Sequence, residues 1–250
     1  MHSFSSKKHS CWFGNDPDPL ARMRLLCFPH AGGTAAPYYS WQAHFPSEIQ
    51  VCPVELPGRG GRIGEPIPES LLKLVTRLLE ESAPYFDRPI AFFGHSLGAF
   101  AGFELAKTML RWKLPAPKKL FVSACRAPQI ARTDDPIHHL EDREFIREMA
   151  KMNGTPNEVL KHEELLSVLL PALKGDFRLA ETYEYAPAQP LPCAIFAFGG
   201  NEDESVSRGD LVAWHSQTTG AFNLHMLPGT HFFLERQGSK VAKLVADALA

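Results

Sequence analysis

A chain of 250 residues, 44% of them hydrophobic, is long enough to bury a substantial core in one α/β domain or two smaller ones. Its 26 Lys and Arg residues against 28 Asp and Glu residues give a formal net charge of -2, which excludes bulk electrostatic attraction to nucleic acid or to an anionic membrane. No apolar run is long enough to cross a bilayer, so a soluble protein is expected.

The beginning of the chain lacks the apolar core of a signal peptide. We expect residues 1–20 to form a flexible N-terminal extension and residues 21–250 to form one domain. Most of the cysteines lie in or beside apolar runs, and none form a CxxC pair; they are Cys11, Cys27, Cys52, Cys125 and Cys193. This usage predicts reduced thiols in a cytoplasmic protein, and no His or Cys pair has the spacing of metal ligands.

Short apolar runs bounded by turn residues are typical of strands. Several of these runs are continuous rather than alternating, as expected for strands of a parallel sheet that helices cover on both faces. The expected strands are Met23–Phe28, Ile49–Val54, Ile90–Phe93, Leu120–Ala124, Ala194–Phe198 and Phe222–Leu227.

Helical patterns lie between and after these runs. Apolar residues repeat at helical spacing from Leu71 to Leu79, from Phe100 to Met109 and from Val241 to Ala248. Strand and helix therefore alternate, which predicts an α/β fold with a mainly parallel sheet flanked by helices.

The alternation breaks between Pro128 and Pro187, where no strand pattern appears. A connection between parallel strands normally needs only about a dozen residues, so residues 130–183 are expected to form a helical lid over one end of the sheet. The pattern leaves open whether it is a mobile lid or a fixed cap. Its helices are expected over Asp142–Lys151, Pro156–Lys161 and Glu163–Tyr183, the last interrupted at Pro171 and Gly175.

A nucleophile motif follows the third strand. The chain runs from Phe93 into Gly94-His95-Ser96-Leu97-Gly98, and a helical pattern begins at once. This is the strand–turn–helix context of GxSxG in the α/β-hydrolase fold, where side chains in place of the two glycines would collide with neighbouring elements. The motif predicts Ser96 as a nucleophile, which needs a base and an orienting carboxylate.

The base follows from chain order, because this fold supplies its partners in the order serine, acid, histidine. His231 lies in the loop after the last strand. His225 lies within that strand, His215 lies in the preceding helical stretch, and His95 cannot easily turn back on the adjacent serine. Position therefore favours His231.

The acid is expected in the loop after the fifth strand, which carries Glu202, Asp203 and Glu204. Asp203 lies far enough past the strand to turn back towards the end of the sheet, so we favour it. Glu202 and Glu204 remain rivals. The acid would hold the imidazole in the correct tautomer and stabilise the imidazolium.

The loop after the first strand reads Pro29-His30-Ala31-Gly32-Gly33-Thr34. Its glycines allow backbone N–H groups to face the site, which predicts an oxyanion hole formed by the N–H groups of Ala31 and Leu97. An ordinary tight turn is the alternative.

Five motifs in this order resemble those of the type II thioesterases that accompany nonribosomal peptide and polyketide synthases, and the resemblance covers nearly all of the chain from about Leu25 to the C-terminus. The motifs are FPHAGG at Phe28–Gly33, LPGRGGR at Leu56–Arg62, FFGHSLGA at Phe92–Ala99, GNEDESV at Gly200–Val206 and PGTHFFL at Pro228–Leu234. The resemblance places a catalytic triad on Ser96, Asp203 and His231. One departure is Lys174-Gly175-Asp176, where family members often carry Arg-Ala-Asp.

The resemblance implies hydrolysis of acyl thioesters on the phosphopantetheine arm of acyl or peptidyl carrier proteins, in an editing role that clears misprimed short acyl groups. No cofactor or metal of the enzyme's own is expected, and the net charge and ligand spacing predict no nucleic-acid, membrane or metal partner. Three alternatives stay open, because fold and triad serve many chemistries. They are a medium-chain acyl-releasing thioesterase of fatty acid synthesis, a carboxylesterase or lipase, and a non-enzymatic interaction protein.

A carrier-protein partner also predicts a docking face. Carrier proteins are generally acidic, so the face that receives one should be locally basic. The candidates are Arg59 and Arg62 after the second strand and Arg126 after the fourth.

Overall fold

The computed structural model describes residues 11–152 and 163–250. They form a six-stranded parallel sheet with the order β2-β1-β3-β4-β5-β6. The predicted strands are confirmed: β1 and β6 have the expected ends, and the ends of the others differ by one or two residues. The strands are β1 Met23–Phe28, β2 Ile49–Pro53, β3 Ile90–His95, β4 Lys119–Ser123, β5 Ala194–Gly200 and β6 Phe222–Leu227.

Helices connect the strands, in agreement with the predicted alternation. The α-helices are α1 Ala36–Tyr39, α2 Leu71–Glu81, α3 Leu97–Arg111, α4 Asp142–Lys151, α6 Glu163–Glu181, α7 Arg208–Val212 and α8 Leu234–Leu249. Short 3₁₀ helices are η1 Ser40–His44, η2 Gly60–Arg62, η3 Ala83–Phe86 and η4 Ala213–Gln217.

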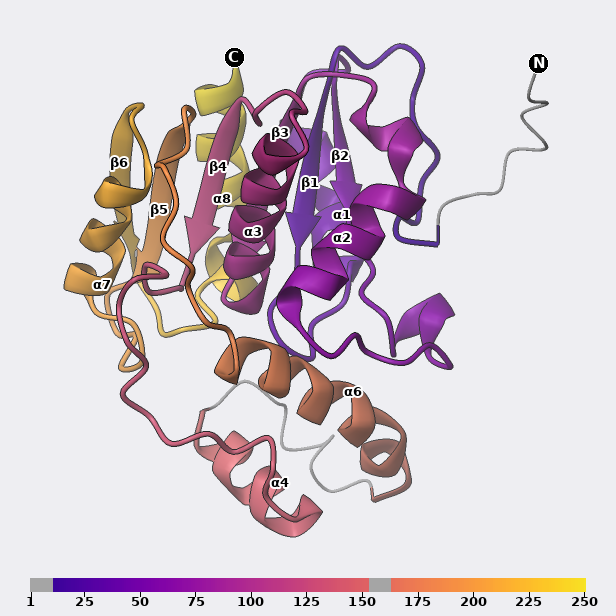
Figure 1. Cartoon of the computed structure of the whole chain (residues 1–250), viewed down its shortest axis with the longest axis vertical. Helices are drawn as coiled ribbons and strands as arrows, with labels where there is room; N and C mark the ends of the chain where they lie inside the picture. Colours follow the sequence, from indigo (N-terminus) through magenta and orange to yellow (C-terminus); the bar gives the residue numbers. More distant parts are fainter. Residues whose placement is uncertain (1–10, 153–162) are drawn as a thin grey trace.

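Two layers of helices cover the sheet, with α2 and α3 on one face and α8 on the other (Figure 1). The first strand shows how its sequence supports both layers. Leu26 and Phe28 pack with the α2 and α3 side, whereas Leu25 and Cys27 pack with the α8 side, and all four are buried. Successive side chains of a strand point to opposite faces, so a continuous apolar run fits a strand covered on both sides.

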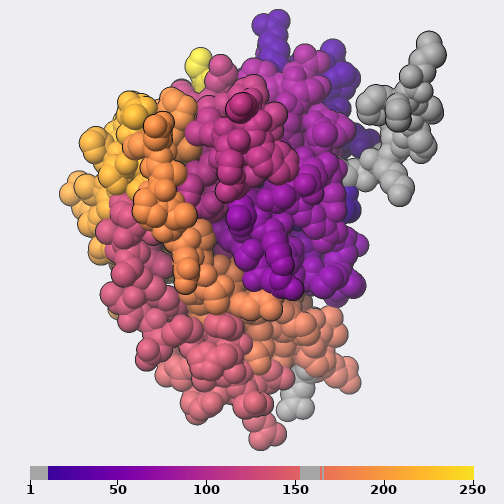
Figure 2. All heavy atoms as spheres, viewed as in Figure 1, coloured from indigo at the N-terminus to yellow at the C-terminus, as the bar shows by residue number. Residues whose placement is uncertain are grey.

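The insertion lies beyond the carboxyl ends of the strands, where α4 and α6 form a separate layer (Figure 1). Phe145 and Met149 of α4 pack with Leu170 of α6 in a small apolar cluster of their own. In Figure 2 the side chains of this region form the lower part of the molecular surface. The helix expected over Pro156–Lys161 lies outside the described residues.

The predicted interruption of the last lid helix is wrong. Helix α6 runs from Glu163 to Glu181 and contains both Pro171 and Gly175. A proline inside a helix removes one backbone hydrogen bond. Packing on the inner face, where Ala172 and Leu179 are buried, outweighs this local preference, as tertiary contacts commonly do.

The beginning of the described chain also differs from the expected flexible extension. Trp12 is fully buried, and the guanidinium of Arg62 lies over its ring at 3.9 Å. Phe13 forms an isolated bridge with Val54 and is buried. The free energy gained by burying these two aromatic rings holds the otherwise polar segment against the domain. The packed domain therefore includes Trp12 and Phe13.

The buried cysteines agree with the sequence analysis, since Cys27, Cys52, Cys125 and Cys193 are buried free thiols. Within residues 11–152 and 163–250, no helix combines the length and the apolar character needed to cross a bilayer.

Candidate active site

Ser96 occupies the turn between β3 and α3. Its φ of 53° and ψ of -116° place it in a region that a residue with a β-carbon rarely adopts. Its N–H donates to the carbonyl oxygen of Ser123 at 2.8 Å, and its own carbonyl accepts from Ala99 N–H at 2.9 Å. Backbone hydrogen bonds on both sides thus hold the strained conformation that GxSxG predicts.

The two glycines of the motif are sterically required. A β-carbon on Gly94 would lie 2.0 Å from the carbonyl oxygen of Gly98, and one on Gly98 would lie 2.3 Å from the carbonyl oxygen of Phe28. Both contacts are with backbone atoms, which cannot move without displacing β1 or α3. The predicted reason for the glycines is confirmed.

We expect Gly98→Ala to lower the free energy of unfolding by about 3 kcal/mol or more, because the new methyl group overlaps the backbone of β1. Gly64→Ala is the matched control, since a β-carbon there meets nothing within 4 Å and the effect should stay within about 0.5 kcal/mol. Urea unfolding of both variants checks this. Equally small changes in the unfolding free energy of the two variants would show that the turn between β3 and α3 tolerates a side chain at Gly98.

His231 and Asp203 form a pair in which the acid is buried and the imidazole is partly exposed. The distance between His231 Nδ1 and Asp203 Oδ2 is 2.9 Å, and the Asp203 side chain is 1% exposed. The other carboxylate oxygen accepts from Ser205 N–H at 2.9 Å, Ser205 Oγ at 2.7 Å and Val206 N–H at 3.1 Å. Burial alone would raise the pKa of Asp203, but the hydrogen bonds from His231 and Ser205 outweigh it and lower the pKa. A carboxylate can only accept, so Nδ1 carries the proton.

The rival residues lie elsewhere. Glu202 and Glu204 are exposed on the same loop. His95 is buried, with its Nδ1 2.9 Å from Ser123 Oγ. His225 stacks against Phe198 on the sheet, and His215 lies in η4. Among the candidates considered, the Asp203–His231 pair is the one the structure brings together.

The loop after β1 forms a tight turn whose hydrogen bond does not use the Ala31 N–H. Gly33 N–H donates to His30 O at 2.9 Å, and Gly32 has a φ of +75°, as a type II turn requires of its third residue. The Ala31 N–H takes no part in this bond. Leu97 opens α3, so its N–H has no partner within the helix and lies at the positive end of the helix dipole.

These groups share one cavity of about 220 Å³. Helix α6 contributes Phe177 and Glu181 to its wall, and α3 contributes Phe100, so the insertion covers the cavity that contains Ser96. The residues of interest that line it are Ser96, His231, Ala31 and Leu97. In the described part of the chain, no group of three or more His, Cys, Asp or Glu residues is arranged to hold a metal ion.

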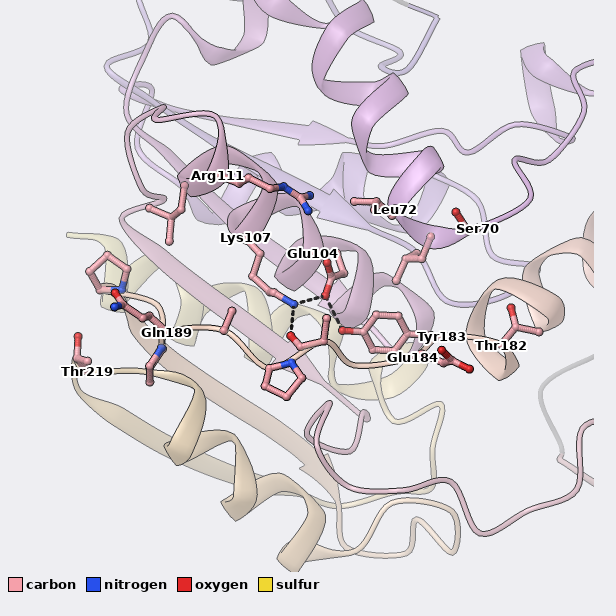
Figure 3. A pocket seen from close by; sticks show the side chains of 17 residues that line it. Ser70, Leu72, Glu104, Lys107, Arg111, Thr182, Tyr183, Glu184, Gln189 and Thr219 are labelled. Atoms are coloured by element: carbon pink, nitrogen blue, oxygen red, sulfur yellow. Dashed lines mark hydrogen bonds and ion pairs between the residues drawn. The ribbon is translucent and has the colours of Figure 1, made fainter.

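A larger cavity of about 1040 Å³ lies between α3 and the chain from Thr182 to Pro192 (Figure 3). Glu104 accepts there from Tyr183 Oη at 2.7 Å and from Lys107 Nζ at 2.9 Å. Neither the nucleophile motif nor the Asp203–His231 pair lines this cavity. The hydrogen bonds of Glu104 attach the connection between α6 and β5 to α3. The larger of the two cavities is therefore not the one that contains Ser96 and His231.

The basic docking face predicted from Arg59 and Arg62 is wrong, because their side chains are buried. Arg62 forms an ion pair with Glu65 at 2.7 Å, and Arg59 forms one with Asp176 of α6 at 2.7 Å. Buried charges require such partners. The two arginines lie in a glycine-rich segment, which is typical of an exposed turn, and the partner of Arg59 is 117 residues away in the sequence.

Arg126 is half-buried. Its guanidinium lies over the Phe100 ring at 5.2 Å, and its Nε donates to Ile130 O at 3.0 Å. It lines the cavity that contains Ser96.

His30 provides a pH-dependent contribution to stability. Its ring packs edge-on against the rings of His95 and Phe232, with centroid distances of 5.7 and 5.3 Å. Burial, followed by the neighbouring charges of His231 and Arg59, lowers the pKa of His30 from 6.5 to about 4. The unfolded chain therefore binds this proton at a higher pH than the folded protein does.

We expect His30 to reduce stability as the pH falls from 6.5 towards 4, by about 3 kcal/mol at most. A His30→Asn variant cannot take up this proton, so its unfolding free energy should fall less over the same interval. Urea unfolding at several pH values between 7 and 4.5 measures the difference. Parallel curves for the two proteins would contradict the assignment.

Comparison with known proteins identifies the family of this chain. Residues 23–249 match the family model described as "Thioesterase domain". The gramicidin S biosynthesis protein GrsT of Aneurinibacillus migulanus is 43% identical over 224 residues, which cover 89% of this chain and 88% of GrsT. Thioesterase PikA5 of Streptomyces venezuelae is 35% identical over 234 residues, covering 93% of this chain and 83% of PikA5.

A solved structure is similar over the full length as well. The type II thioesterase BorB from the borrelidin biosynthetic cluster superimposes with a TM-score of 0.86 at 35% identity, covering 98% of this chain and 100% of BorB. The chain therefore belongs to the thioesterase family, a family of hydrolases, and has the α/β-hydrolase fold.

Proposed function

We propose that this chain is a type II thioesterase that hydrolyses acyl thioesters on the phosphopantetheine arms of carrier proteins in a nonribosomal peptide or polyketide synthase. It would remove misprimed short acyl groups. The observation that carries the proposal is one cavity lined by Ser96 and His231, with His231 hydrogen-bonded to the buried Asp203. Relatives of nearly the same length, among them GrsT and BorB, support the synthase context.

The proposed reaction uses Ser96, Asp203 and His231 as a triad. Nδ1 of His231 is committed to Asp203, which leaves Nε2 to take the proton of the Ser96 hydroxyl as its oxygen attacks the thioester carbonyl. The N–H groups of Ala31 and Leu97 would stabilise the negative oxygen of the tetrahedral intermediate.

The carbon–sulfur bond then breaks, and His231 gives its proton to the departing thiolate. In the second half-reaction His231 removes a proton from water, which attacks the acyl-enzyme and releases a carboxylic acid and free Ser96. The steps use only groups of the chain and water. The pantetheine arm arrives with the substrate, so no cofactor of the enzyme's own is proposed.

The cavity supports a short acyl group. Pockets for drug-sized ligands range from about 300 to 1,000 Å³, whereas the cavity here measures about 220 Å³. Its wall includes the apolar rings of Phe100 and Phe177, which an alkyl chain can contact. The carrier partner and the buried free thiols support a cytoplasmic location.

The test is a comparison of kcat/KM for a short acyl group on a carrier protein, a medium-chain acyl group on the same carrier, and a p-nitrophenyl ester. We expect the short acyl-carrier thioester to exceed the ester by about 100-fold, because contacts with the carrier contribute to transition-state binding. Preference for the ester would favour a carboxylesterase. Preference for the medium chain would favour an acyl-releasing enzyme of fatty acid synthesis.

A further inference from the structure

A buried ion pair joins the insertion to the main domain. Arg59 Nη1 donates to Asp176 Oδ2 and Nη2 donates to Oδ1, both at 2.7 Å. The side chains are 4% and 1% exposed. This paired geometry matches the planar guanidinium to the planar carboxylate and fixes both their distance and their orientation.

The same two side chains also bind the backbone of the turn His30–Gly33, which is called the oxyanion turn below because it contains the proposed donor Ala31. Asp176 Oδ2 accepts from Gly32 N–H at 2.7 Å, and Arg59 Nη1 donates to Gly33 O at 2.9 Å. Both contacts are with backbone groups of the residues that follow Ala31. The pair therefore restrains the peptide groups next to the proposed oxyanion donor, one from its N–H side and one from its carbonyl side.

Helix α6 contacts this turn at a second point. A β-carbon on Gly32 would lie 2.4 Å from Leu173 Cδ2, so the turn lies directly against Leu173. Leu173 and Asp176 are three residues apart and occupy the same face of α6. Gly32 is thus fixed by a polar and an apolar contact from one helix, and the position of the turn depends on where that helix lies.

Stability alone is a weak reason for such an arrangement. The cost of removing two charges from water can exceed the attraction between them, and well-packed apolar residues often replace a buried pair without loss. Two oriented polar side chains do, however, fix the directions of backbone N–H and C=O groups, which apolar residues cannot do.

We propose that Arg59 and Asp176 are positioning residues that fix the orientation of the Ala31 N–H in the oxyanion hole. Through them, the geometry of the oxyanion hole depends on the position of α6 against the turn. The inference rests on the proposed function. A displacement of about 1 Å at a catalytic group can cost about 100-fold in rate, so a loosened turn should be visible in kcat.

The first test is Asp176→Asn, which keeps the shape of the side chain but removes its charge. We expect kcat for a carrier-bound acyl thioester to fall by about 10-fold to 100-fold, with KM changed by less than about twofold, since the turn acts on the transition state. An acyl trifluoromethyl ketone, which forms an oxyanion adduct with the serine, should bind more weakly by the same factor. A merely structural role would not move this affinity.

A second variant guards against loss of folding. The double replacement Arg59→Met with Asp176→Leu removes both charges at similar volume, so neither is left buried without a partner. It should unfold no more readily than Asp176→Asn and should show the same loss of kcat. A third test compares Arg59→Lys with Arg62→Lys as its matched control. Arg62 is equally buried on the same loop, but it pairs with Glu65 and forms no hydrogen bond with the oxyanion turn.

Arg62→Lys should leave kcat unchanged, whereas Arg59→Lys should lower it. Folded Asp176→Asn and double variants that keep kcat within about twofold of the wild type would overturn the inference, whatever their melting temperatures. A Ser96→Ala variant that retained turnover would instead overturn the proposed function, so the two failures can be told apart.

Discussion

Ser96→Ala is expected to lower kcat for thioester hydrolysis by about a thousandfold or more, because the variant loses the nucleophile while the binding cavity and the oxyanion donors remain. Stability should hardly change. The Ser96 side chain makes no capping hydrogen bond at the start of α3, so alanine removes no contact of that kind. Steady-state kinetics with an acyl-carrier thioester and thermal unfolding of the same preparation measure the two effects.

Ser70→Ala is the matched control. Ser70 also precedes a helix, and its side chain accepts from Lys73 N–H as an N-cap of α2. Its removal should cost about 1 kcal/mol of stability and leave kcat unchanged. The two serines should thus show opposite patterns. A Ser96→Ala variant that keeps a tenth of the wild-type kcat would mean that the nucleophile lies elsewhere.

Asp203→Asn is expected to lower kcat by about a thousandfold to ten-thousandfold, because it imposes the wrong tautomer on His231. One side of the carboxylate accepts from the N–H groups of Ser205 and Val206, so the amide oxygen of an asparagine must occupy that side. Its NH₂ group would then face Nδ1 of His231 and force the imidazole proton onto Nε2. In that state Nε2 cannot accept the proton of Ser96.

Glu202→Gln and Glu204→Gln are the controls on the same loop. Both residues are exposed, so each change should alter kcat by less than about twofold, as expected of solvated surface charges. Steady-state kinetics of the three variants decide the matter. Comparable losses in all three would remove Asp203 from its proposed role.

The sequence predicts the sheet and the strand–turn–helix context of GxSxG well, because both depend on local patterns. Several strands are continuous apolar runs that end in a turn, and GxSxG lies where β3 meets α3. Chain order alone brings Asp203 and His231 to the same end of the sheet, and the structure places them 2.9 Å apart. No sequence pattern specifies that distance, but the loop positions limit the choice.

What sequence reasoning misses depends on contacts between distant residues. Arg59 and Asp176 are separated by 117 residues, so no local pattern indicates that the arginine is buried. Trp12 lies in a polar segment, yet it packs under Arg62. Pro171 reads as a helix break but lies on the exposed side of α6, where the buried face of the helix outweighs it. In each case tertiary packing overrides local preference.

The central claim is a covalent acyl-Ser96 intermediate. The most direct measurement mixes the protein with a short acyl-carrier thioester, quenches the reaction within milliseconds and identifies the modified peptide by mass spectrometry. We expect one added acyl group on the peptide that contains Ser96, formed before the free acid appears. Acylation of a different residue, or turnover with no acylated protein at any time, would contradict the mechanism.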